Sequence, residues 1–468
     1  MVRSSITRRE AIAALGAVGA GGVAGCTGNG NGGNGNGGGV TDTPTDTGGM
    51  GASGTVKIGV LQPLSGAVKY YGQSATWAFY SGFAYKAGGA SPVDATPGSQ
   101  TVTVGDVDYE LIMRDTQASP DVAQEAATEL VENDEVDMLW GMNTAPALRV
   151  IETVSKPANV LTMLGSVPDT TVTANSKYCG DLIFRPFENS AMICRPSSRY
   201  MLENTDLSDV YMIGADYSWG RDVIRQHRTI LEGEGGANIL EERYVPRGYE
   251  EWQGILDDVE AQGADTFVHA FTVATSPPLI RAYLTGDYSF RVYGPGLATN
   301  VFQKVVGQLL QSVIGKPLTE YEEEVENLKL GPEAATYYWN QYDNPINDEF
   351  VDIYTEAYGL YPGAFAGGSF TAASALVQAV EETGSTEMAD VASALSGMTV
   401  TETVKGENQY EFQEYNNHAR SPMTISKLVP NENKENWAAA VRPSEPLATI
   451  PKDETTLPEN DPQMDCSL

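Results

Sequence analysis

Short apolar runs alternate with helical segments along most of this chain, and this alternation restricts the possible folds more than any other feature. In the first instance, Val56 to Tyr85, β-branched residues at alternating positions lead into a polar loop and then into aromatic residues at helical spacing. Six further runs of this kind lie at 109–114, 136–140, 160–164, 210–214, 266–270 and 290–293. Repeated β-α units form parallel sheets with helices on both faces, joined by right-handed crossovers.

The strand-helix pattern occurs as two sets, separated by a stretch rich in Pro and Arg at 178–197. A chain of 468 residues also exceeds the size of one hydrophobic core. The sequence therefore predicts an α/β fold with two doubly wound parallel-sheet lobes, whose strand-end loops face each other across a cleft.

The amino terminus has the composition of an export signal. Arg8 and Arg9 precede a short apolar run that ends at Cys26. Residues 1–26 resemble a twin-arginine signal, and the VAGC sequence resembles a lipobox, in which Cys26 is lipidated. An uncleaved membrane anchor is the alternative, and both place the protein outside the membrane. Residues 27–54, mostly Gly, Asn and Thr, read as a flexible tether.

The charge balance excludes one class of partner. There are 62 acidic and 29 basic residues, which give a net charge of -33. Nucleic-acid binding needs a basic face, so we expect no nucleic-acid partner. Acidic residues spread along the chain are typical of halophilic proteins, whose carboxylate surface stays hydrated in high salt. Calcium loading is the alternative, but the sequence contains no calcium-loop motif.

The order of several sequence blocks resembles a known family over residues 54–430. The blocks are VKIGVLQPLSG with YYG, LIMRDTQASPDVAQEAATELVEND, VDMLWGMNTAPAL, LTMLGSVPD, IFRPFENS, DYSWGRDV and GADTFVHAF. Together they are similar to the extracellular solute-binding proteins that include branched-chain amino acid receptors of ABC importers, which have the type 1 periplasmic binding fold. With the amino terminus, the chain resembles a lipoprotein of the haloarchaeal type.

The resemblance implies three crossovers between the lobes, near 178, 337 and 397. Lobe 1 would then comprise residues 55–177 plus 343–396, and lobe 2 residues 178–342 plus 397–430. Residues 431–468, which are acidic and Pro-rich, fit no block and are expected to form a loose tail.

The same resemblance implies which residues contact a ligand. An aromatic side chain after the first strand would cover it, and loops after the third and fourth strands would donate hydrogen bonds to it, although simple helix capping uses the same donors. Lobe 2 and the second crossing would add aromatic walls, which core or hinge packing explains equally well. The expected ligand-binding residues are Tyr71, Asn143, Thr144, Gly165, Ser166, Trp219, Phe271, Gly296 and Tyr342.

One block departs from the family pattern. In GPGLATN, Gly296 stands where amino-acid receptors usually carry an acid that pairs with the ligand ammonium. A buried ammonium without a carboxylate partner is unfavourable by several kcal/mol. The hypothesis is therefore that the ligand is an amide, a urea-like compound, a carboxylate or an aromatic acid rather than a plain amino acid. Asp216 is a possible substitute charge.

Cysteine and histidine usage gives no metal site. Cys179 and Cys194 lie 15 residues apart and allow a disulfide, with free buried thiols as the alternative. The three histidines are scattered and lack the spacing of zinc ligands.

The predicted function is that of a membrane-anchored extracellular receptor that captures a small polar solute and delivers it to ABC permease subunits. A ligand sensor that signals through a membrane partner is the alternative. The sequence contains no nucleophile elbow, P-loop or metal cluster, so we expect neither an enzyme nor a cofactor.

Overall fold

A six-stranded sheet forms from the first set of predicted strands. The computed structural model describes residues 51–66, 68–89, 94–272, 275–294, 307–312, 329–431 and 439–468. The sheet order is β2-β3-β1-β4-β5-β6, and every neighbouring pair is parallel except β2 with β3. The strands are β1 (Gly54–Gln62), β2 (Gly98–Val104), β3 (Val107–Asp115), β4 (Met138–Gly141), β5 (Leu161–Leu164) and β6 (Ile183–Phe184).

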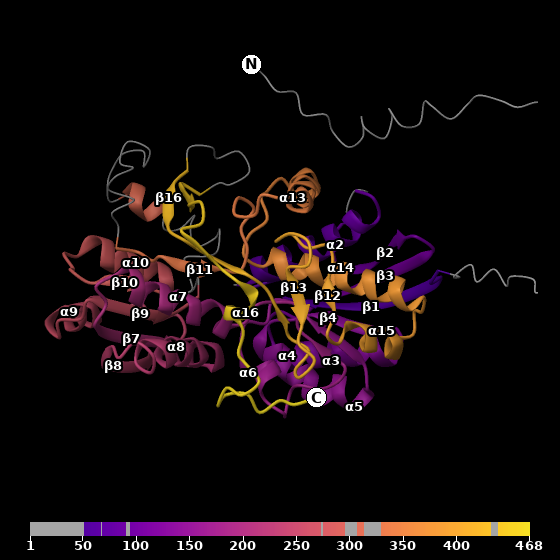
Figure 1. Ribbon diagram of the computed structural model, residues 1–468, viewed down its shortest axis with the longest axis horizontal. Helices are drawn as coiled ribbons and strands as arrows, with labels where there is room; N and C mark the ends of the chain where they lie inside the picture. The colour runs from indigo at the N-terminus through magenta and orange to yellow at the C-terminus, as the bar shows by residue number, and fades with distance from the viewer. Residues whose placement is uncertain are drawn as a thin grey trace, which may run out of the picture. The chain divides into compact units, whose positions relative to one another are not determined.

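Helices cover both faces of this sheet, as Figure 1 shows. Val56, Ile58 and Val60 of β1 point to one face and pack with α2 and α14, while Leu61 points to the other face and packs with α3 and α4. This division follows from the two-residue period of a strand. The helices of this part are α2 (Lys69–Lys86), α3 (Pro120–Glu132), α4 (Thr144–Val150), the π-helix η1 (Ile151–Ser155), α5 (Lys156–Ala158), α6 (Thr171–Ala174), α13 (Pro345–Tyr358), α14 (Ala366–Thr383) and α15 (Met388–Leu395).

The second predicted set forms a four-stranded parallel sheet of order β10-β9-β7-β8. Its two faces carry separate apolar clusters, one with α9 and α10 and the other with α7 and α8. The elements are α7 (Ser190–Asn204), β7 (Asp209–Ala215), α8 (Ser218–Leu231), β8 (Asn238–Val245), α9 (Gln253–Ala261), β9 (Thr266–Ala270), α10 (Ser276–Thr285) and β10 (Arg291–Tyr293). The α/β class with parallel sheets is confirmed.

Ser119 and Pro120 begin α3: the Ser119 hydroxyl accepts a hydrogen bond from the N–H of Val122, and Pro120 is the first helical residue. Three strands of these two sheets lie outside the predicted runs. β2 lies at the sheet edge and is partly exposed, β6 is buried but has only two residues, and β8 carries charged side chains.

The carboxyl-terminal third adds short antiparallel sheets. They contain β11 (Glu333–Ala335), β12 (Thr399–Val400), β13 (Tyr410–Phe412), β14 (Ala419–Arg420), β15 (Met423–Ser426), β16 (Leu428–Pro430), β17 (Val441–Pro443) and β18 (Ala448–Ile450), and α16 (Lys452–Thr455) follows. Met398, Val400 and Phe412 lie in the core of the six-stranded sheet. The stretch 397–430, assigned to lobe 2 from sequence, therefore also contributes to the first core.

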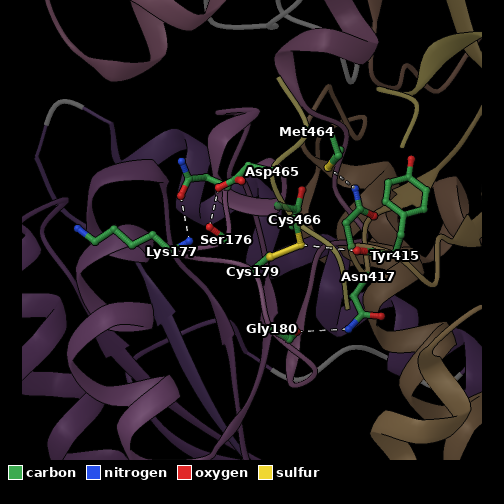
Figure 2. Close-up of a disulfide and its surroundings, with 12 residues drawn as sticks. Ser176, Lys177, Cys179, Gly180, Tyr415, Asn417, Met464, Asp465 and Cys466 are labelled. Atoms are coloured by element: carbon green, nitrogen blue, oxygen red, sulfur yellow. Dashed lines mark hydrogen bonds between the residues drawn. A yellow bond between two sulfur atoms is a disulfide. The ribbon is translucent and has the colours of Figure 1, made fainter. Parts of the chain in front are cut away.

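The end of the chain is held by a disulfide rather than running loose. Cys466 is bonded to Cys179, across 287 residues of sequence (Figure 2). Nearby, the Ser176 hydroxyl donates to Asp465, and the Asp465 N–H donates to the carbonyl of Ala174. A pair between Cys179 and Cys194 is therefore wrong, since Cys179 is bonded to Cys466 and Cys194 is a fully buried thiol of α7 outside any disulfide. Sequence spacing favoured the nearer cysteine because it cannot show where the tail returns.

An ion pair also ties this tail to α7. Arg195 lies 2.6 Å from Asp461, and both side chains are almost fully buried. In the part of the chain that the structure describes, no helix is both long and apolar enough to cross a membrane.

We expect residues 54–468, when unfolded without reductant, to show one titratable thiol, that of Cys194, and three titratable thiols after reduction. Thiol titration in denaturant measures both numbers. Replacing Cys179 and Cys466 with Ser should lower the free energy of unfolding by about 2–5 kcal/mol, because the cross-link restricts the unfolded chain. Replacing either cysteine alone should lower the free energy of unfolding by as much as replacing both, because each change removes the same disulfide. Three thiols before reduction would refute the bond.

Candidate functional site

The carboxyl ends of β1, β4 and β5 lie at one edge of the first sheet. Leu61 pairs with Gly141, and Gly141 pairs with Leu164, so the loops that follow these strands start side by side. The N–H of Gly165 donates to the carbonyl of Gly141 at 2.7 Å. This edge is where open parallel sheets hold ligands.

Four predicted residues meet at this edge. Asn143 precedes α4, Thr144 is the first residue of that helix, and Gly165 and Ser166 follow β5. The hydroxyl of Ser166 lies 3.4 Å from the carbonyl of Met142, which joins the two loops. Thr144 and Ser166 are both buried. The structure thus brings together the residues that were expected to donate hydrogen bonds to a ligand.

Helix capping does not account for Asn143. The side chains of Ser119, Asn189 and Asn344 each accept a hydrogen bond from the helix that they precede. The side chain of Asn143 makes no such bond, and its buried Oδ1 has no protein hydrogen-bond partner in the described part of the chain. The Asn143 amide oxygen is therefore available to a ligand.

Tyr71 lies in the first turn of α2 and belongs to a row of aromatic rings. Its ring centroid is 4.8 Å from that of Phe365, and Phe365 stacks on Phe187 at 5.7 Å. We call Tyr71, Phe365 and Phe187 the aromatic row. Phe365 is the residue before the first residue of α14. Phe187 lies just before Asn189, the residue that precedes α7. The resemblance supplied Tyr71 alone, because the other two rings are distant in sequence.

Tyr217 immediately precedes α8 and is a further aromatic candidate. Burial raises the pKa of its hydroxyl, and the guanidinium of Arg247, 4.8 Å from the ring centroid, opposes that rise. The charges of Tyr71 and Asp169 add to the rise in pKa. Sequence reasoning chose Trp219 in the same DYSWG segment, and the Tyr217 ring lies 6.0 Å from that of Trp219.

Trp219 and Phe271 lie in packed surroundings. Trp219 is a member of the α7–α8 cluster. Phe271 is fully buried, with its ring 5.0 Å from Trp252 and 5.7 Å from His269. The structure shows packing at both positions, and their contact with a ligand stays a prediction. Gly296 and Cys26 lie outside the described residues.

Tyr342 lies beside a buried ion pair. Its ring stacks on Tyr337 at 5.9 Å, and the ammonium of Lys405 is 5.7 Å from its centroid. Lys405 lies 2.7 Å from Glu188, and both side chains are fully buried. Lys405 also donates to Ser421 and to the carbonyl of Pro422, and the hydroxyl of Tyr410 donates to Glu188. Burial lowers the pKa of Lys405, and the charge of Glu188 partly opposes this shift.

The carboxylates near the strand-end loops already have partners. Asp115 accepts hydrogen bonds from the N–H groups of Leu64 and Gln117. Asp216, the possible substitute charge, pairs with Arg221 at 2.6 Å.

Asp169 is also engaged, since it accepts from the N–H of Thr171 at 2.9 Å. Burial and the nearby charge of Asp222 raise the pKa of Asp169. Asp115, Asp169 and Asp216 thus each have a hydrogen-bond or ion-pair partner within the protein.

Gln62 is a candidate that sequence reasoning passed over. It ends β1 and is fully buried, yet neither atom of its amide has a hydrogen-bond partner within the described residues. A signal was present in the sequence, because Gln62 continues the alternation of Val56, Ile58 and Val60 with a polar side chain. Polar groups at such buried positions normally have partners.

Comparison with a protein-family model matches residues 55–434 to the family described as "Periplasmic binding protein". No curated protein matches the chain.

Solved structures share the fold at low identity. A solute-binding protein of an ABC transporter from Rhodopseudomonas palustris BisB5, in complex with 3,4-dihydroxybenzoic acid, is 19% identical with a TM-score of 0.65, over 85% of this chain and 98% of its own. A second R. palustris protein, in complex with benzoate, is 17% identical with a TM-score of 0.66, over 86% and 99%. A leucine-, isoleucine-, valine-, threonine- and alanine-binding protein from Brucella ovis is 17% identical with a TM-score of 0.68, over 87% and 97%.

The buried ion pair generates a stability prediction. Lys405→Met should lower the free energy of unfolding by about 3–5 kcal/mol, because it leaves Glu188 as an uncompensated buried charge. Adding Glu188→Gln to this variant should recover part of the loss. Denaturant unfolding measures both effects.

Lys86→Met is the matched control, since Lys86 pairs at 2.8 Å with Glu402, which is partly exposed. Lys86→Met should lower the free energy of unfolding by about 1 kcal/mol or less. Equal losses for Lys405→Met and Lys86→Met would contradict the assignment of a charged pair to the buried site.

Proposed function

Since the chain belongs to the periplasmic binding protein family, we propose that it captures a small solute without a free ammonium group and delivers it to an ABC importer. The solute would bind at the carboxyl edge of the first sheet. Gln62, Asn143 and Ser166 would contact its polar group, and the aromatic row with Tyr217 would cover its body.

The engagement of the nearby carboxylates is the observation that carries this choice of solute. An amino-acid ligand buries an ammonium, which requires a carboxylate partner. Asp115 and Asp169 serve backbone N–H groups, and Asp216 serves Arg221. Together with Gly296 in the block where amino-acid receptors carry an acid, this favours solutes such as amides, urea-like compounds and organic acids. The benzoate ligands of the R. palustris proteins are of the last kind.

Capture would follow from the equilibrium between open and shut forms. We infer that the two parallel sheets are the centres of two lobes. A solute that touches both lobes only in the shut form shifts the population toward it, and the permease recognises that form. The Glu188–Lys405 pair joins segments near the expected first and third crossovers, so it would hold the hinge together during closure.

The site of action would be the outer face of the cell membrane. Residues 1–26 carry the export and lipobox pattern, with Cys26 as the lipid attachment point and residues 27–54 as the tether. A lipid-anchored receptor remains close to its permease.

A thermal-shift screen of residues 54–468 in molar KCl tests the proposed solute class. Leucine and valine are compared with 4-methylpentanoate, 4-methylpentanamide and 3-methylbutanoate, which keep their carbon skeletons but lack their ammonium groups, and urea, benzoate and benzamide are added. A ligand at 100 times its dissociation constant stabilises the protein by roughly 2.7 kcal/mol.

We expect at least one ammonium-free solute to raise the melting temperature, and leucine and valine to leave it unchanged. Stabilisation by leucine or valine that exceeds stabilisation by their ammonium-free analogues would refute the proposed class.

A further inference from the structure

The amide of Gln62 is the most exceptional polar group at the edge of the first sheet. Its side chain is fully buried, and both Oε1 and Nε2 are without protein partners among the described residues. A buried polar group in this condition destabilises the free protein unless a ligand or water completes it.

Two glycines make room for this amide. A Cβ atom placed on Gly141 would lie 3.0 Å from Gln62 Nε2, and one placed on Gly165 would lie 2.9 Å from it. The amide therefore lies across the ends of β4 and β5, where the loops of Asn143 and Ser166 begin. Backbone groups here are already paired, since Gly165 N–H donates to Gly141 and Met142 N–H donates to Leu61. These backbone groups bond each other and form no hydrogen bond with the Gln62 amide.

Asn143 adds a second unpartnered oxygen at the same edge. Its buried Oδ1 has no partner in the described part of the chain, and its side chain does not cap α4. The edge thus presents an amide donor and acceptor from Gln62 and a further amide group from Asn143. A ligand that completes this set must carry N–H donors as well as a carbonyl acceptor.

We propose that Gln62 determines ligand specificity by binding a carboxamide or urea-like group. The Oε1 atom would accept a hydrogen bond from the ligand N–H, and Nε2 would donate one to the ligand carbonyl. A carboxylate offers only acceptors and would leave Oε1 unsatisfied, whereas an ammonium offers only donors and would leave Nε2 unsatisfied. This inference rests on the proposed function and narrows its solute class to neutral amides.

The first experiment compares matched amides and acids in calorimetric titrations of residues 54–468 in molar KCl. The pairs are 4-methylpentanamide with 4-methylpentanoate, and benzamide with benzoate. We expect the wild type to bind at least one amide about 10-fold or more tightly than the matching acid, and Gln62→Leu to remove that preference. Equal or tighter binding of the acids would overturn the role of Gln62.

The second experiment needs no ligand. Gln62→Leu should leave the melting temperature of the free protein unchanged or raise it, because it removes two unpartnered polar atoms. Gln378→Leu is the matched control, since the buried amide of Gln378 bonds with Thr399, Thr401 and Glu382. That variant should melt at a lower temperature and keep the wild-type dissociation constant.

The two experiments separate the two claims. Binding of leucine or valine in place of every ammonium-free probe would refute the proposed function. A melting temperature for free Gln62→Leu that falls as far as that of Gln378→Leu would show that the Gln62 amide has a structural partner. That result would overturn the role of Gln62 whichever probe binds.

Discussion

The parallel pairing of β1 with β3 on one side and β4 on the other is the constraint on which the candidate site depends. Parallel strands end at the same edge, so three loops distant in sequence must start next to one another. Gln62 then lies beside Gly141. Gly165 also lies beside Gly141, because it directly follows Leu164 of β5, which pairs with Gly141. A shift of one residue in this register would turn Gln62 away from its present face. The apolar residues Val56, Ile58 and Val60 pack into the core and fix the register of β1, and this register sets the position of Gln62.

Two kinds of buried polar group occur near this edge, and the difference between them is informative. Glu188 and Lys405 pair through Glu188 Oε1 and are further bonded to Tyr410 and Ser421, which is how a folded chain tolerates buried charge, and only Glu188 Oε2 has no partner among the described residues. The Gln62 amide has no such partners in the described residues. A buried charge held by an opposite charge stabilises one arrangement of the chain, whereas an amide with neither atom bonded gains its hydrogen bonds when a solute arrives. We therefore assign structure to the first and recognition to the second.

Much of the fold could be predicted because buried parallel strands leave a clear apolar signal. The runs that became β1, β3, β4, β5, β7, β9 and β10 were all recognised. The partner of Cys179 was not, because the return of the tail depends on contacts such as Arg195 with Asp461 that no local pattern encodes. The loop residues Asn143, Thr144, Gly165 and Ser166 could be located from their strand ends. Phe187 and Phe365 could not, since three-dimensional packing alone brings those rings into one row with Tyr71.

A crystal structure of the protein with its tightest-binding solute tests the central claim most directly. The account predicts that the polar group of the solute lies within hydrogen-bond distance, about 3 Å, of the Gln62 amide, with its body against Tyr71. A solute bound elsewhere, with the Gln62 amide still buried and out of its reach, would contradict the assignment of this sheet edge as the binding site.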